Sequence, residues 1–328
     1  MIPEFPQFKS LELSDRKDVE EITKKHPPYS AFNFTNFWAW DIRKDRKISK
    51  LNGNLVTLST DYLTVEPFLS FLGTHKCEDT VLQLLHFAKK SKISPKLRFI
   101  TEESVQHLNS NNIEIKEDRG SFDYLFSTFE LSKLRGIKFK EERHLADRFS
   151  KEYPDAVFQL EDLSDSSVQE KLLLVLRQWE NGKKIQNKTC DLSFEEKALC
   201  RLLETSSRHK LILSCVFLHG EMLGFSIDEI LPNHHAMAHF IKANNSFKGI
   251  YEFLNRELAH HLIAHNVVLF WNWQQDLELE NLRKTKIGYR PVGFLKKYTV
   301  SFKVQEDFGK KFSGITMNNI AKRVKKEV

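Results

Sequence analysis

The chain has 328 residues, of which 41% are hydrophobic and 12% aromatic, enough for more than one hydrophobic core. Its 29% of charged residues and its many apolar ones exclude a disordered chain, and no apolar run reaches the roughly 18 residues of a membrane span. The net charge of +6 permits a polyanionic partner such as RNA or an anionic membrane surface. We therefore expect a globular protein of two domains.

The cysteines and the N-terminus indicate the compartment. Cys77, Cys190, Cys200 and Cys215 are scattered without a CxxC pair, which is typical of reduced thiols. The first residues lack the basic and apolar regions of a signal peptide. We expect a cytoplasmic protein that reaches a membrane, if at all, from its surface.

The N-terminal part of the chain predicts helices alternating with short strands. A capped helix is expected over residues 14–25, and Asn52-Gly53 predicts a β-hairpin. Further along we expect a helix over 79–90, a strand over 97–100, a helix over 102–108 and a strand over 113–116. This alternation predicts a mixed sheet flanked by helices, in a first domain that covers residues 1–130.

Two segments allow both a structural and a nucleic-acid interpretation. The aromatic segment 29–41 could stack on bases, but aromatic stripes are more often core, and we favour packing. The helical segment 134–153 carries a basic cluster that is either a solvated face or a set of phosphate contacts. The cluster consists of Arg135, Lys138, Lys140 and Arg143.

The second predicted domain covers residues 131–328 and has clearer boundaries between its elements. A strand over 157–160 is followed by helices over 164–180 and 193–206 and by a hairpin that turns at His219-Gly220. The domain continues with a strand over 235–242, a long helix and a buried strand, and it ends with a short helix and further strands. This order fits the sheet of a GCN5-related N-acetyltransferase.

Several motifs resemble a known family. The strongest are HFIKAN, KGIYEFLNRELA and NWQQDLELENLRKTKIGYRP, and weaker ones are FNFTNFWAW and RGIKFKEERHLADRF. Together they resemble the cytosolic C-terminal domain of phosphatidylglycerol lysyltransferase. The resemblance implies an α/β (α+β) protein of two tandem acetyltransferase-like domains, each a mixed, mostly antiparallel sheet flanked by helices. It also implies transfer of an aminoacyl group from aminoacyl-tRNA to an amine or hydroxyl, without a further cofactor.

The first polar loop of this region follows the strand that ends at Lys242. In an acetyltransferase-like fold this strand should splay from its neighbour, and the helix that begins near Phe247 or Lys248 should aim its free N–H groups at a ligand. A coenzyme A loop is rich in glycine, whereas this one has only Gly249. We therefore favour an aminoacyl-adenosine end, with Lys242, Asn244 and Lys248 as substrate-binding residues.

The second polar loop carries the predicted catalytic residues. Arg283 and Lys286 stand three residues apart, and a fixed cation can bind phosphate or stabilise the oxyanion of ester attack. Asp276 could orient Arg283 or accept a proton, and Tyr289 could shuttle one. The resemblance places this segment in the active region. The further predicted substrate-binding residues are Asn272, Gln275 and Arg290.

Other chemistries have weaker signals. His261 and His265 have the spacing of a zinc pair, but the segment lacks the glutamate of HExxH, and we expect no metal. Two alternatives to aminoacyl transfer stay open: acyl-CoA-dependent N-acyl transfer, and a non-catalytic module that binds an anionic ligand or RNA.

Overall fold

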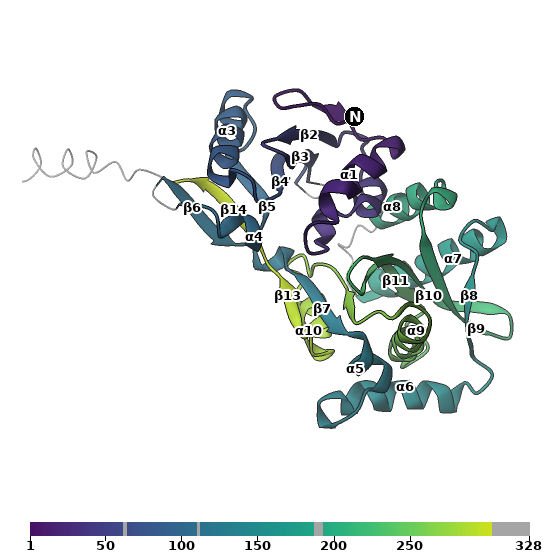
Figure 1. The fold of residues 1–328 in the computed structure, drawn as a ribbon. Coiled ribbons are helices and arrows are strands. Elements are labelled where there is room, and N and C mark those ends of the chain that lie inside the picture. Colours follow the sequence, from purple (N-terminus) through teal and green to yellow (C-terminus); the bar gives the residue numbers. More distant parts are fainter. Residues whose placement is uncertain (62–63, 110–111, 187–192, 304–328) are drawn as a thin grey trace, which may run out of the picture.

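The computed structural model describes residues 1–61, 64–109, 112–186 and 193–303. Strands and helices alternate from one end of this range to the other, in three sheets with helices packed on their faces (Figure 1). The sequence-based fold class, a mixed and mostly antiparallel α/β protein, is confirmed. Among the described residues, no helix is both long and apolar enough to cross a membrane.

A first series of elements runs to residue 127. Its strands are β1 (Lys9–Ser10), β2 (Lys47–Leu51), β3 (Asn54–Thr60), β4 (Pro67–Leu72), β5 (Lys96–Thr101), β6 (Ile113–Glu117) and β7 (Asp123–Ser127). Its helices are α1 (Arg16–Thr23), α2 (Phe34–Ala39), α3 (Cys77–Lys90) and α4 (Glu102–Val105). The predicted hairpin at Asn52-Gly53 is confirmed: both residues have a positive φ, as this tight turn requires. The aromatic segment 29–41 packs in the core, as we favoured.

A short helix α5 (Thr128–Lys133) and a longer helix α6 (Lys140–Glu152) lead to a second series of elements. Its strands are β8 (Val157–Glu161), β9 (Leu211–Leu218), β10 (Glu221–Leu231), β11 (His235–Ala243), β12 (Phe270–Asn272), β13 (Gly293–Leu295) and β14 (Lys297–Phe302). Its helices are α7 (Ser166–Gln186), α8 (Ser193–Leu203), α9 (Ile250–Asn266) and α10 (Glu280–Gly288). The 3-10 helices aside, this series repeats the first one element for element.

The two repeats exchange their last strands. The seven-stranded sheet has the order β13-β7-β12-β11-β10-β9-β8, so β7 of the first repeat lies between two strands of the second. In return, β14 lies between β5 and β6 of the first repeat, in the order β5-β14-β6. Each inserted strand is antiparallel to both neighbours. The division into domains at residue 130 stays a prediction, but each half supplies a strand to the other's sheet.

Helices cover both faces of the seven-stranded sheet (Figure 1). On one face, α7 and α8 pack their leucines on Leu213, Phe225 and Phe240. On the other face, α9 packs on Ala236 and Trp271 together with side chains of α5 and α6. Burial of these apolar surfaces is the main stabilising contribution to the sheet.

Helix α9 begins at Ile250, slightly later than predicted, because Gly249 has a left-handed backbone that no right-handed helix continues. A Cβ atom on Gly249 would lie 2.1 Å from the carbonyl oxygen of Leu145 in α6. Glycine is therefore required at position 249 for two reasons: its φ of 89° and the close approach of α6.

We predict that Gly249→Ala destabilises the protein by about 3 kcal/mol, since it combines left-handed strain with a steric clash. Gly220→Ala is the matched control: Gly220 has a φ of 85°, but a Cβ atom added there would have no atom within 4 Å, and its cost should be about 1 kcal/mol. Urea unfolding of both variants measures the difference. Equal losses of stability would contradict the role given to the contact with Leu145.

Candidate functional site

Each repeat contains one place where neighbouring central strands separate. In the first repeat, β4 and β5 contact each other but belong to different sheets. The rings of Phe68 and Phe99 meet there edge to face at 5.3 Å, and the Arg98 guanidinium lies over both. The predicted site residues all belong to the second repeat, which we therefore take as the candidate site.

In the second repeat, the parallel ladder between β11 and β12 stops after the pair Met237 and Asn272. Strand β11 continues to Ala243 without β12 beside it. The ladder ends where β12 ends, and the splay of β11 from its neighbour stays a prediction. We call the region beyond this last pair, Met237 and Asn272, the gap.

The loop from Trp273 to Leu279, here called the gap loop, leaves β12 at the gap and leads into α10. Three of its residues other than glycine, Gln274, Leu277 and Glu278, have a left-handed backbone, at a cost of about 1 kcal/mol each. Such strain persists only where surrounding contacts enforce it. The Gln274 amide donates to the Ala238 carbonyl of β11, so the loop bridges the start of the gap.

The predicted catalytic residue Lys286 donates hydrogen bonds to the backbone of the gap loop. Its amine donates to the carbonyl oxygens of Trp273 at 2.6 Å and Gln275 at 2.5 Å. The side chain is buried, and burial lowers the pKa of Lys286 to about 7. The structure thus places this amine against backbone carbonyls inside the protein, and its predicted role in phosphate binding stays a prediction.

Asp276 is part of the gap loop, and its side chain joins the loop to its surroundings through hydrogen bonds. Its carboxylate is fully buried and accepts hydrogen bonds from Arg283 Nε at 2.8 Å and Nη2 at 2.9 Å, from the Tyr124 hydroxyl and from the Glu278 backbone. Arg119 donates to the same carboxylate at 3.3 Å. Burial alone would raise the pKa of Asp276, but these bonds outweigh it and keep the pKa below its ordinary value. The predicted pairing of Asp276 with Arg283 is confirmed.

Arg283 and Lys286 lie on a helix, which corrects their placement in a loop. Helix α10 has few apolar residues, so its sequence lacks an apolar stripe. It is held instead by its first-turn hydrogen bond from the Arg283 N–H to the Leu279 carbonyl and by an ion pair of Lys284 with Glu280. The helical spacing places Lys286 inside and leaves Arg283 about one third exposed.

The predicted residue Lys242 lies near the end of β11, beside the gap. Its amine pairs with Glu195 of α8 at 2.9 Å and lies 3.6 Å from the centre of the Trp179 ring of α7. Asn244, in the loop that follows, donates to Gln178 of α7 at 3.3 Å. Helix α7 therefore packs against the loop that would receive a ligand phosphate.

The other predicted residues are dispersed around the gap loop. Asn272 is buried and donates to the Pro28 carbonyl, and Gln275 reaches Ser30. Tyr289 is buried between Asn255 and Glu252, and burial raises its pKa far above the ordinary value, so the hydroxyl keeps its proton. Lys248 and Arg290 are exposed. Asp276, Lys286 and Gln275 are thus brought together at the gap loop.

Sequence reasoning missed two residues at the gap, Arg119 and Gln274. Arg119 lies far from Asp276 in the chain and reaches it only because β7 is inserted beside β12. Gln274 stands within the NWQQD motif, next to the predicted binding residue Gln275. Within the described residues, no cluster of three or more histidine, cysteine or acidic side chains could hold a metal ion.

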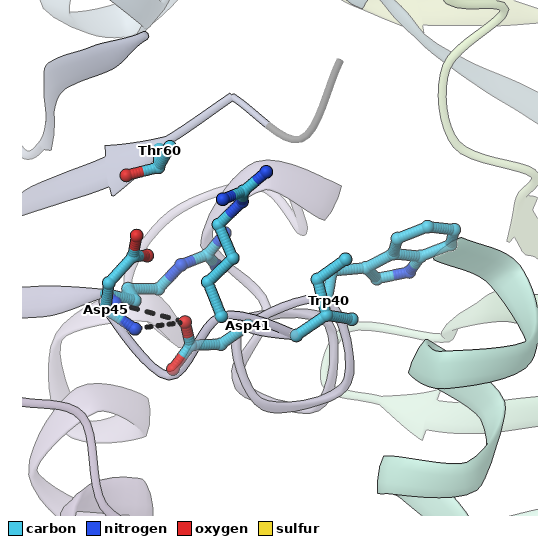
Figure 2. Close-up of a pocket in the computed structure, with 7 residues that line it drawn as sticks. Trp40, Asp41, Asp45 and Thr60 are labelled. Carbon is cyan, nitrogen blue, oxygen red and sulfur yellow. Dashed lines mark hydrogen bonds between the residues drawn. The ribbon is translucent and has the colours of Figure 1, made fainter. Parts of the chain in front are cut away.

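Two hollows lie away from the gap. Figure 2 shows the smaller, of about 10 Å³, where Asp41 accepts hydrogen bonds from the Asp45 and Arg46 backbone at 3.0 Å. It has room for about one water molecule. The larger, of about 390 Å³, lies between α8 and the segment 42–44. Neither is lined by residues of the gap loop.

The end of the β11–β12 ladder, the helix that follows β11 and the strand order define an acetyltransferase-like protein. The family model of the phosphatidylglycerol lysyltransferase C-terminal domain matches residues 24–301. The chain therefore belongs to this family, as its motifs indicated. Family and fold together support acyl transfer as the class of reaction.

Solved structures share the fold. A conserved protein of unknown function from Bacteroides thetaiotaomicron is 24% identical, with a TM-score of 0.79 over 92% of this chain and 100% of that one. The C-terminal domain of a putative lysylphosphatidylglycerol synthetase from Agrobacterium fabrum is 12% identical, with a TM-score of 0.61 over 88% and 91%. L-PGS from Bacillus licheniformis is 14% identical, with a TM-score of 0.61 over 92% and 93%. No curated protein sequence gives a significant match.

We predict that the stability of the protein rises with pH through the titration of Lys286. The unfolded lysine keeps its ordinary, higher pKa and binds more protons than the folded one above about pH 7, so raising the pH favours folding. From about pH 7 to about pH 9 the wild-type protein should gain about 2 kcal/mol relative to Lys286→Met. Urea unfolding of both proteins across this range is the measurement. Parallel stability curves would contradict the burial of a titrating amine.

Proposed function

We propose that the protein transfers an aminoacyl group from aminoacyl-tRNA to a lipid, peptide or small amine acceptor, and that the reaction takes place at the gap of the second repeat. The observation that carries the proposal is the end of the β11–β12 ladder at Met237 and Asn272, in a chain of this family. We place the ester of the donor there, where direct attack by an amine or hydroxyl needs no covalent enzyme intermediate.

The cations around the gap support an anionic donor. Lys242 lies near the end of β11, where it pairs with Glu195, and Arg283 is fixed by the buried carboxylate of Asp276. Fixed guanidinium groups bind phosphate well and stabilise negative charge that develops in ester attack. The position of both cations agrees with a donor that carries phosphates and an activated ester.

The loop from Asn244 to Gly249 favours aminoacyl-tRNA over acyl-CoA. Asn244 is bonded to Gln178 of α7, and the amide of Asn245 lies 3.9 Å from the Cβ position of Gly182. At the other end, Gly249 is in close contact with α6. The glycine-poor loop is therefore packed between two helices, which supports a donor that does not thread its pyrophosphate through it.

A deacylation assay tests the proposal. The protein is incubated with a pool of charged tRNAs and with total cell lipids, peptides and amines, and the loss of each amino acid from tRNA is followed. We expect selective loss that depends on an acceptor. No loss from any tRNA would overturn the proposal; acyl transfer from acyl-CoA would then establish the alternative enzyme, and ligand binding without turnover would establish a binding module.

We predict that Arg283→Gln lowers the kcat/KM for the aminoacyl-tRNA at least about tenfold, since a charge-assisted hydrogen bond contributes about 1.5–3 kcal/mol. Glutamine retains a donor for Asp276 while the charge is lost. The control is Lys284→Gln on the same helix, whose side chain is 70% exposed and pairs with the exposed Glu280. Its kcat/KM should stay within about twofold of the wild type. Equal losses in both variants would show a general charge effect and remove Arg283 from the site.

A further inference from the structure

Arg119, in the 3-10 helix before β7, belongs to the first repeat but lies on the gap loop of the second. Its Nη1 donates to Asp276 and its Nη2 to the Tyr124 hydroxyl at 2.9 Å. The guanidinium also lies 4.8 to 5.3 Å from the centres of the rings of Phe122, Tyr124 and Phe294. These contacts fix a side chain that is still 35% exposed.

Arg119 and Arg283 share a single carboxylate. Both pair with Asp276, so one positive charge of the two is not neutralised there. Two buried lysines are also present in this region. Lys286 donates to backbone carbonyls, and Lys297 forms an ion pair with Asp123. The excess positive charge therefore lies on Arg119 and Arg283, which share the one carboxylate of Asp276. Uncompensated charge in a partly buried cluster is costly, and an anionic ligand would offset it.

The exposed edges of the two guanidinium groups offer donors. Arg283 uses Nε and Nη2 on Asp276 and also interacts with Tyr124, while its side chain stays 37% exposed. Arg119 uses its two terminal nitrogens and leaves Nε without a partner within the described residues. Because the side chains are already fixed, little rotamer entropy is lost when they bind a ligand.

We propose that Arg119 and Arg283 form one anion site, built from both repeats on Asp276, which binds a backbone phosphate of the RNA portion of the donor. This inference rests on the proposed function and adds Arg119 as a binding residue. Arginine suits the role because its guanidinium stays charged and its charge-assisted hydrogen bonds to phosphate are strong. Asp276 is then a positioning residue, which orients both guanidinium groups without touching the RNA.

Binding of uncharged tRNA tests the inference separately from transfer. The affinity of the wild-type protein is compared with that of Arg119→Gln, Arg283→Gln and the double variant over a series of salt concentrations. Each single change should weaken binding about tenfold, and the double variant should lower the slope of log affinity against log salt by about one unit for each phosphate that is no longer bound. Lys284→Gln, the control on α10, should stay within about twofold of the wild type. Thermal unfolding checks that each variant is folded.

Three results would overturn this site. In the first, folded Arg119→Gln and Arg283→Gln bind tRNA as the wild type does. In the second, Lys284→Gln weakens binding as much as they do, which indicates only a diffuse charge effect. In the third, the changes abolish binding to vesicles of anionic lipid and leave tRNA binding intact. If tRNA binding depends on both arginines while no aminoacyl transfer is detected, the anion site stands and only the proposed reaction fails.

Discussion

A fully buried ion pair joins the two exchanged strands. Lys297 on β14 and Asp123 on β7 lie 2.7 Å apart, and neither side chain is exposed to solvent. Ser30 donates to the same carboxylate through its backbone N–H at 2.7 Å. Removal of one partner from a buried pair leaves an uncompensated charge, at a cost of about 3–5 kcal/mol. This pair therefore ties the sheet of the first repeat to that of the second, next to the gap loop.

The position of the gap loop follows from that connection. With β7 beside β12, the Tyr124 backbone binds both Trp273 and Gln274, and the Gly120 carbonyl accepts from Leu277. Lys286 and Asp276 add their contacts from the second repeat. The left-handed residues of the loop are thus held from both halves of the chain. Two of the residues that the sequence suggested for chemistry serve here, in the first place, to maintain backbone geometry.

Local sequence patterns were sufficient for most elements of the fold. Alternating apolar residues and Asn-Gly or His-Gly turns identified the hairpins, and the motif from Asn272 to Pro291 identified the region of the gap loop. Helix α10 was harder to predict because its sequence is polar. Arg119 could not be found at all, since its relation to Asp276 depends on the strand exchange, and neither local propensity nor motif spacing encodes such a long-range pairing.

The strand exchange also governs the order in which the chain can fold as it is synthesised. The sheet of the first repeat lacks its central strand β14 until residues 297–302 have left the ribosome, and β5 and β6 have until then no strand between them. Domains commonly fold one after another during synthesis, N-terminal first. Here the sheet of β5 and β6 is completed only after the last strand of the second repeat has been made. Completion of the first sheet therefore depends on the synthesis of the second repeat, and neither repeat can complete its sheets alone.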